Sequence, residues 1–360
     1  MSGPLKIVQL IDNLAPGGAE RVVIMLSAGL AARGHHVMLV VSEGGGLLEA
    51  QVADAGFEYR VMEHSAPFGV DGMARLGRML SRERVDVLHC HLLGSDIVGR
   101  TAGLLARVPV VVSTAHERRP RGVVYDTFRM ITSRLIDATI ACGADVEVHC
   151  REHLRVPAAK LRRVDNGVDA QRFASARKEF DRVRTLAIVA SHTPVKGHEY
   201  LFRALATLAP DYPDLRLDVV GTGPLEPELR EMVRTLGLDG TVCFLGARPD
   251  VAAALAEVEA VVLPSLDEGL PIAVLEAMAA RKVVIASAVS AIPEVLDGGA
   301  AGVLVPPGDS EALAAAIAGV LDDPEPLRLA DAALARVEHA YSADAMVEAY
   351  LRIYQELGAS

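Results

Sequence analysis

The chain has 360 residues, 51% of them hydrophobic, and a formal net charge of −11 at pH 7. This length suffices for two domains with substantial cores. So acidic a chain, with no nucleic-acid-binding motif, argues against duplex nucleic acid as a partner. The four cysteines form no Cys-x-x-Cys pair, so neither a disulfide framework nor a zinc ribbon is indicated.

Charge and hydropathy bear on where the protein acts. The longest uncharged runs, 22–32 and 283–293, are about half as long as a membrane span, and the first ten residues read as a strand rather than a signal peptide. We therefore expect a cytoplasmic setting. Segment 100–163 holds 12 basic and 6 acidic residues, including Arg118, Arg119 and Arg121. Either a solvated basic face or attraction to an anionic membrane surface or acceptor accounts for this bias.

Apolar runs alternate with helix-length segments through the first half of the chain. We predict strands at 6–11, 36–41, 59–62, 85–89, 108–113 and 138–141. We predict helices at 19–32, 47–55, 73–82, 97–106, 125–135 and 144–153. This alternation indicates a parallel, doubly wound sheet with helices on both faces.

A polar, turn-rich stretch at 160–185 interrupts the pattern, with a turn at Asn166-Gly167, and we interpret it as a linker. A second series follows, with strands at 185–190, 216–220, 242–245, 260–263, 283–287 and 302–305. Its helices are expected at 198–208, 227–236, 251–256, 271–280, 292–296 and 310–321, before a last amphipathic helix within 342–360. The fold class is therefore α/β, with two Rossmann-like domains, 1–170 and 171–341, and a cleft between them.

Two features of the first domain have candidate chemistry. Gly17 and Gly18 lie between a strand and a helix N-terminus, where backbone N–H groups can meet an anion, although a tight turn alone also explains them. His89 and His91 end one strand, and His116 follows the next. Two histidines on one strand face could ligate a metal, but no carboxylate or third histidine completes a recognisable spacing, so no metal is expected. His116 is the better candidate for a polar contact in the cleft, and an ordinary strand-end histidine remains the alternative.

The second domain offers groups suited to a nucleotide diphosphate. Lys196 lies beside a helix N-terminus, which combines a point charge with the helix dipole. The glycine-containing turn 221–223 repeats this layout one unit later. Glu276 lies on a helix face whose neighbours at three and four residues are all apolar, and Glu268 precedes the same helix. A buried carboxylate needs donors, which either the protein or a polyhydroxyl ligand supplies.

The order of motifs along nearly the whole chain resembles the retaining glycosyltransferases of family four, which have the GT-B fold. Glu268 and Glu276 are similar to that family's signature of two glutamates separated by seven residues. The other matching motifs are Gly17-Gly18-Ala19-Glu20, His116, Asn166-Gly167-Val168-Asp169, Lys196-Gly197, Gly221-Thr222-Gly223-Pro224, Phe244-Leu245-Gly246, Ile292-Pro293-Glu294 and Val305-Pro306-Pro307-Gly308-Asp309.

The resemblance implies that the N-terminal domain binds an acceptor and the C-terminal domain a nucleotide-sugar. It implies ribose binding by Glu276, sugar contact by Glu268 and diphosphate neutralisation by Lys196. His116 would lie near the sugar, and Gly18 would donate its backbone N–H to the phosphate. The implied catalytic residues are His116, Lys196 and Glu268. The implied donor-binding residues are Gly17, Gly18, Ser191, Lys196, Gly221, Gly223, Arg248, Glu268, Gly269, Leu270, Pro271 and Glu276.

The resemblance also implies a reaction. The sugar would move with retention of anomeric configuration to a glycan, lipid-linked or small-molecule acceptor, by a front-face route in which the leaving phosphate helps to deprotonate the acceptor. No metal and no cofactor beyond the UDP- or GDP-linked donor is implied, because lysine and helix N-termini would take the metal's place. The last helix would cross back to the first domain through Tyr350, Leu351 and Tyr354.

The chain departs from the family at three places. Ser191 stands where the family often has an arginine that shares the diphosphate with the lysine, and His192 or Arg248 are the candidates to compensate. Ser290-Ala291 replace glycines before Ile-Pro-Glu, and Glu117 follows His116 where aspartate is common. The alternatives to a glycosyltransferase are a nucleotide-sugar epimerase and a non-catalytic nucleotide-sugar-binding protein. The glutamate signature argues against the first, and Ser191 motivates the second.

Overall fold

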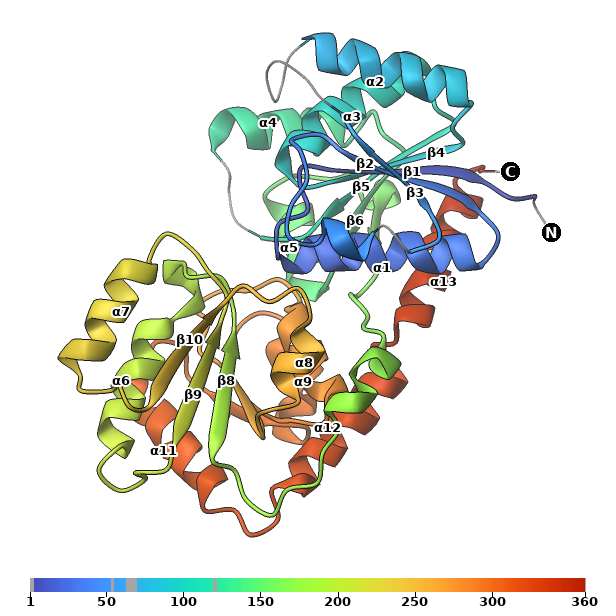
Figure 1. The fold of residues 1–360 in the computed structure, drawn as a ribbon. Helices are drawn as coiled ribbons and strands as arrows, with labels where there is room; N and C mark the ends of the chain where they lie inside the picture. Colours follow the sequence, from blue (N-terminus) through green and yellow to red (C-terminus); the bar gives the residue numbers. More distant parts are fainter. Residues whose placement is uncertain (1–2, 53–54, 63–69, 119–121, 360) are drawn as a thin grey trace. The chain divides into compact units, whose positions relative to one another are not determined.

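The computed structural model describes residues 3–52, 55–62, 70–118 and 122–359, and the chain forms two compact units (Figure 1). Unit 1 consists of residues Met1–Gly167 and Ala343–Ser360, and unit 2 of Val168–Ser342. Arg119 and Arg121, part of the basic segment, lie outside the described residues.

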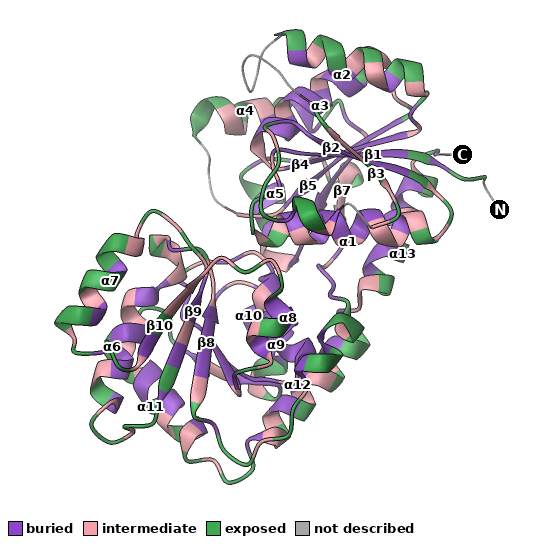
Figure 2. Ribbon diagram, in the orientation of Figure 1, coloured by how far each residue is buried: buried purple, intermediate pink, exposed green. Residues whose placement is uncertain are grey.

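Unit 1 is built on a parallel sheet of seven strands in the order β3-β2-β1-β4-β5-β6-β7. The strands are β1 (Lys6–Ile11), β2 (His36–Val41), β3 (Glu58–Val61), β4 (Val87–His91), β5 (Val110–Ala115), β6 (Ala138–Ala141) and β7 (Leu161–Arg163). The helices are α1 (Gly18–Ala32), α2 (Val70–Glu83), α3 (Leu93–Ala106), α4 (Val123–Thr132), α5 (Ala144–Glu152) and α13 (Ala343–Glu356). The central strands are fully buried, as expected of a parallel sheet covered on both faces (Figure 2).

The last helix, α13, completes unit 1, as the resemblance implied. It packs against α1, where Gly29 permits a close approach, since a Cβ there would lie 2.6 Å from a Val347 methyl carbon. Tyr350 and Tyr354 of α13 are fully buried. Arg33 at the end of α1 pairs with Asp344 and Glu348 of α13.

Unit 2 is built on a parallel sheet of six strands in the order β10-β9-β8-β11-β12-β13. The strands are β8 (Thr185–Val189), β9 (Arg216–Val220), β10 (Val242–Gly246), β11 (Ala260–Leu263), β12 (Val283–Ser287) and β13 (Val303–Val305). The helices are α6 (His198–Leu208), α7 (Glu226–Thr235), α8 (Val251–Leu255), α9 (Ile272–Ala279), α10 (Ile292–Val295), α11 (Ser310–Leu321) and α12 (Leu327–Ala340). Asp250 and Asp309 cap the N-termini of α8 and α11.

The prediction of two Rossmann-like parallel sheets is confirmed, but two local predictions were wrong and one helix was not predicted. Within 47–55, the described residues form only a short 3-10 helix, Glu49–Gln51. The predicted linker 160–185 contains β7, a basic edge strand whose short, polar sequence hides it, and a 3-10 helix, Ala170–Ala176. The helix α12 was missed because its buried side, Ala330, Ala333 and Val337, consists mostly of small residues.

Candidate active site

The strand order of the unit 2 sheet reverses at one point, between β8 and β11. Open parallel sheets bind ligands beyond the carboxyl ends of the strands where the strand order reverses. In unit 2 this point lies between β8 and β11, which are neighbours in the sheet although two strands separate them in sequence. The segment after β8 contains Lys196, and the segment after β11 contains Glu268. The fold therefore brings together two of the residues predicted to act on the donor.

Lys196 and Glu268 form a direct ion pair. The Lys196 Nζ lies 2.7 Å from Oε1 and 2.9 Å from Oε2 of Glu268, and the Ser265 hydroxyl donates to Oε1 at 2.7 Å. The Glu268 side chain is 7% exposed and that of Lys196 is 24% exposed. A charged pair this sheltered from solvent interacts more strongly than a surface pair, so it holds the two segments in a fixed geometry.

Glycine lets the Lys196 segment pass close to the Glu268 segment. Lys196 ends a short 3-10 helix, Pro194–Lys196, and Gly197 follows with φ of 66° before α6 begins. A Cβ at Gly197 would lie 2.0 Å from the Pro264 carbonyl oxygen, so a side chain cannot be accommodated there. In the Lys-Gly motif, packing thus requires the glycine, and the ion pair with Glu268 involves the lysine.

The glycines at 221 and 223 let two loops touch. A Cβ at Gly221 would meet the Ala190 carbonyl oxygen at 2.0 Å, and one at Gly223 would meet the His192 carbonyl oxygen at 2.6 Å. The Gly221 N–H donates to the Gly246 carbonyl at 2.9 Å, so this donor is used within the protein. Packing alone thus requires these two glycines, and their part in donor binding stays a prediction.

The structure distinguishes between His192 and Arg248, the two candidates to compensate for the arginine that Ser191 replaces. Ser191 is exposed and its hydroxyl lies 3.4 Å from that of Thr193. The His192 ring is buried between His198 and Phe244, and burial lowers its pKa. A buried neutral imidazole cannot replace an exposed guanidinium, whereas Arg248 is exposed and charged.

The helix that follows Glu268 buries the second glutamate, as its apolar neighbours predicted. Glu276 is 5% exposed on α9, whose first turn is preceded by Pro271 as N-cap. Leu270 is 4% exposed and Gly269 is partly exposed. The segment 268–271 thus connects the Lys196–Glu268 ion pair directly to the start of α9.

Ser290 explains one departure from the family pattern. Its φ of 52° lies in the left-handed region, which glycine occupies at no steric cost. The Ser290 hydroxyl accepts from the Glu268 backbone N–H at 3.3 Å and donates to Asp267 at 3.4 Å. Serine is less favourable than glycine at this φ, but its hydroxyl forms hydrogen bonds with the segment that contains Glu268.

In unit 1, the start of α1 already holds a carboxylate. The Glu20 side chain folds back over Gly17, where a Cβ would lie 2.1 Å from Glu20 Oε2. Glu20 is 8% exposed, and burial raises the pKa of its carboxyl from 4.5 to about 7. Gly17 therefore lies beside a carboxyl group whose pKa burial raises to about 7.

The Glu20 pKa leads to a prediction about pH. Because the folded state favours the protonated carboxyl, its contribution to stability is complete below pH 4.5 and is lost as the pH rises through 7. A shift from 4.5 to about 7 corresponds to roughly 3 kcal/mol at most. Glu20→Gln should gain stability relative to the wild type between pH 5 and 8 in urea unfolding. Equal pH dependence of Glu20→Gln and wild type would refute this, and Glu228→Gln, at an exposed site, is the control.

His116 and the two strand histidines come together in unit 1. His91 Nδ1 lies 3.0 Å from His116 Nε2, and the rings of His89 and His91 have centroids 3.9 Å apart. Burial, with Arg129 nearby, lowers the pKa of His116 to about 4. Among the described residues, no group of three or more His, Cys, Asp or Glu side chains is arranged to hold a metal ion.

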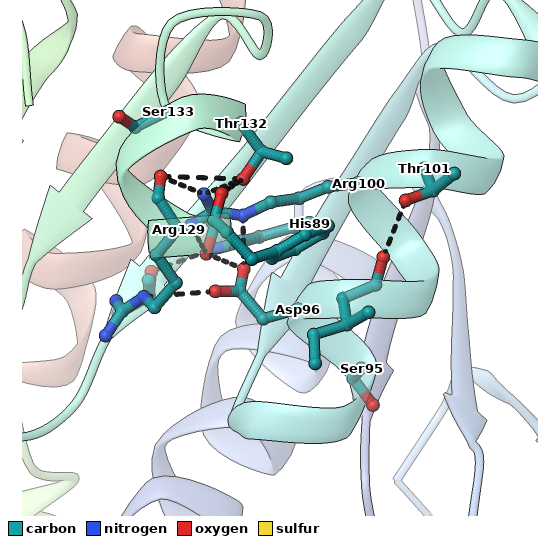
Figure 3. Close-up of polar contacts among 12 residues, drawn as sticks. His89, Ser95, Asp96, Arg100, Thr101, Arg129, Thr132 and Ser133 are labelled. Carbon is teal, nitrogen blue, oxygen red and sulfur yellow. Dashed lines mark hydrogen bonds and ion pairs between the residues drawn. The ribbon is translucent and has the colours of Figure 1, made fainter. Parts of the chain in front are cut away.

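Unit 1 also contains a buried charge cluster that was not predicted. The fully buried Arg100 donates to Asp96 Oδ1 at 2.6 Å, to the Thr132 hydroxyl at 2.9 Å and to the Ser113 hydroxyl at 2.9 Å (Figure 3). Arg129 lies 3.3 Å from the other Asp96 oxygen. The cluster ties α3, β5 and α4 together. The spacing of Asp96 and Arg100, four residues apart in a predicted helix, was the available signal.

Family profiles match most of both units. The profile of Glycosyltransferase Family 4 matches residues 16–172, and that of Glycosyl transferases group 1 matches residues 183–323. The D-inositol 3-phosphate glycosyltransferase of Corynebacterium glutamicum is 30% identical over 301 residues, which cover 73% of this chain and 71% of that protein. The phosphatidyl-myo-inositol mannosyltransferase of Mycolicibacterium smegmatis is 29% identical over 353 residues, with coverages of 94% and 90%.

Solved structures show the same fold. HepE from Anabaena, solved in complex with UDP and glucose, has a TM-score of 0.85 at 21% identity and covers 98% of this chain and 99% of its own. A glycosyltransferase from Rickettsia africae has a TM-score of 0.83 at 19% identity, with 99% of both chains covered. The fold is GT-B, and the chain belongs to glycosyltransferase family four.

Proposed function

We propose that this protein is a retaining glycosyltransferase that moves a sugar from a UDP- or GDP-linked donor to a glycan, lipid-linked or small-molecule acceptor without a metal ion. The observation that carries the proposal is the Lys196–Glu268 pair at the point of strand-order reversal in unit 2. That position suits a charged, polyhydroxyl ligand. Unit 2 is accordingly the donor-binding domain and unit 1 the acceptor-binding domain.

We assign roles in donor binding to four residues of unit 2. Lys196 neutralises the diphosphate, with Arg248 as the second cation in place of the arginine that Ser191 replaces. Glu268 accepts hydrogen bonds from hydroxyls of the sugar, and Glu276 from those of the ribose. Cationic groups that lie where charge develops on the leaving phosphate stabilise the transition state, the task that a metal ion performs elsewhere.

The relatives support a nucleotide-sugar donor. HepE is described in complexes with UDP, with UDP and glucose, and with UDP-glucose. An Escherichia coli relative, 29% identical over 222 residues, is named a UDP-Gal:alpha-D-GlcNAc-diphosphoundecaprenol alpha-1,3-galactosyltransferase. Two mannosyltransferase relatives, from Mycolicibacterium smegmatis and Mycobacterium leprae, have names that refer to a phosphatidylinositol lipid. A nucleotide-linked donor and a lipid-linked or glycan acceptor are therefore proposed for this chain.

The proposal is tested with the whole protein and a panel of UDP- and GDP-sugars. At least one donor should raise the melting temperature and be hydrolysed or transferred, with unchanged turnover after chelation of divalent ions and with retained anomeric configuration by proton NMR. Glu276→Ala should weaken nucleotide binding, whereas Glu257→Ala, at a surface pair, should not. Tight binding of a donor with neither hydrolysis nor transfer would favour a non-catalytic binding protein. Acceptor-independent isomerisation of the sugar would favour an epimerase.

We also propose that unit 1 associates peripherally with an anionic membrane at its cytoplasmic face. No helix among the described residues is long and apolar enough to cross a membrane. Instead, α4 and its end expose an apolar surface, Val123, Val124, Ile131 and Leu135, at 55–87% exposure within the basic segment. Such a combination suits a lipid interface. Co-sedimentation with phosphatidylglycerol vesicles, weakened by Val124→Asp, is expected, and absence of binding at low salt would contradict it.

A further inference from the structure

A single line of hydrogen bonds runs through the core of unit 1 and ends at His116. It joins side chains from four parts of the unit. Tyr354 comes from α13, Gln9 from β1, His91 from β4, and His116 follows β5. The Gln9 amide nitrogen donates to the Tyr354 hydroxyl at 3.4 Å, and its Oε1 lies 2.8 Å from His91 Nε2. His91 Nδ1 then lies 3.0 Å from His116 Nε2.

The line has a direction, which follows from the chemistry of its members. The Gln9 oxygen can only accept, so His91 carries its proton on Nε2. A neutral imidazole has one N–H, so His91 Nδ1 is an acceptor and His116 Nε2 must donate to it. The Nδ1 of His116 is then left with a lone pair. His91 is the only hydrogen-bond partner of the His116 ring within the part of the chain that the structure describes.

Burial keeps the rings of His91 and His116 neutral, so the assigned proton positions hold near neutral pH. Gln9 and His91 are 0% exposed. Burial lowers the pKa of His91 well below 6.5 and, together with Arg129, lowers that of His116 to about 4. At the far end, the Tyr354 hydroxyl contacts His89 Nδ1 at 2.7 Å, and His89 Nε2 contacts the Thr114 hydroxyl at 2.7 Å. These further bonds anchor the line at its Tyr354 end.

We infer that Gln9 and His91 are positioning residues that hold His116 in its Nε2–H tautomer and so present Nδ1 as a hydrogen-bond acceptor for a hydroxyl of the bound substrate. That this substrate is a sugar rests on the proposed function. Gln9 and His91 touch no substrate themselves. Their effect is on the orientation and protonation of one ring, as the outer partners of functional histidines do elsewhere.

The test uses the full chain labelled with nitrogen-15 at histidine. Long-range proton–nitrogen correlation spectra distinguish protonated from unprotonated ring nitrogens, and His116→Gln assigns the signal. Wild type should show His116 with the proton on Nε2. Gln9→Leu removes the acceptor for His91, and Tyr354→Phe frees the Gln9 amide to reorient, so each should give a mixture of tautomers. The control is Ser27→Ala, which removes a buried hydroxyl of α1 that donates to the Val23 carbonyl of the same helix.

Turnover provides the second readout. For Gln9→Leu we expect kcat to fall about 10-fold with KM for the donor nearly unchanged, a size typical of outer-shell partners. An Nδ1–H form of His116 in the wild type, or an unaltered Nε2–H form in both Gln9→Leu and Tyr354→Phe, overturns the inference. If Gln9→Leu and Tyr354→Phe change the tautomer but His116→Gln keeps full activity, the hydrogen-bond assignment stands and the proposed role of His116 is wrong. The spectra do not depend on turnover, so failure of the tautomer assignment and failure of the proposed function are distinguishable.

Discussion

Asp96→Ala is expected to lower the stability of unit 1 by about 3–5 kcal/mol, the usual cost of leaving a buried charge without its partner. Asp96 is 2% exposed, and its carboxylate is shared by Arg100 and Arg129, which are 0% and 6% exposed. Removing it leaves two guanidinium groups in the core with no carboxylate between them. Urea unfolding followed by a probe in unit 1 should show an earlier transition for this unit.

A surface pair in the same unit is the matched control. Arg118 and Asp145 lie 3.9 Å apart with side chains 38% and 37% exposed. Asp145→Ala should change stability by less than about 1 kcal/mol. Similar effects of the two substitutions would show that the cluster around Asp96 contributes no more than an exposed pair, and would contradict its role in joining α3, β5 and α4.

Lys196→Ala is expected to lower kcat/KM for the donor by about 10²–10³-fold, the range found when one preorganised charge-stabilising donor is removed from an active site. The residue is 24% exposed in its side chain and holds both oxygens of Glu268, so its loss also frees the carboxylate that we assign to the sugar. The measurement is initial-rate kinetics on the donor identified by the panel described above.

Two variants refine this prediction. Lys178→Ala removes an exposed lysine that pairs with Glu257 in the same unit and should leave kcat/KM unchanged. Lys196→Ala combined with Glu268→Gln should cost less than the sum of the separate effects, because the two groups contact each other. Activity of Lys196→Ala equal to that of wild type would rule out the assignment of Lys196 to the diphosphate.

The repeating apolar runs were enough to predict both sheets. Most strands begin and end within two residues of the predicted limits, because buried parallel strands such as β1 and β11 read as continuous apolar segments. The pattern failed where burial is partial. The three residues of β7 are exposed or half-buried, and α12 contacts the core chiefly through small residues. In neither case does the hydrophobic period stand out.

The candidate site was predictable only in part. Lys196, Glu268 and Glu276 stood out as charged residues at strand ends or on an apolar face. The ion pair between Lys196 and Glu268 could not be predicted from the sequence. The two residues are 72 positions apart and come together because β8 and β11 are neighbours in the sheet. Gln9 was invisible for the opposite reason, as a single polar residue within a buried strand carries no pattern of its own.

The division of unit 1 into two stretches of chain has a consequence for biosynthesis. Unit 2 is continuous, so it can form as soon as it leaves the ribosome, whereas unit 1 must wait for α13, which is translated after all of unit 2. Until then the sites of Tyr350 and Tyr354 in unit 1 stay empty, and Gln9 lacks the hydroxyl that orients its amide. A nascent chain thus completes unit 2 first, and the hydrogen bonds from Tyr354 that lead to His116 form only in the last step of folding.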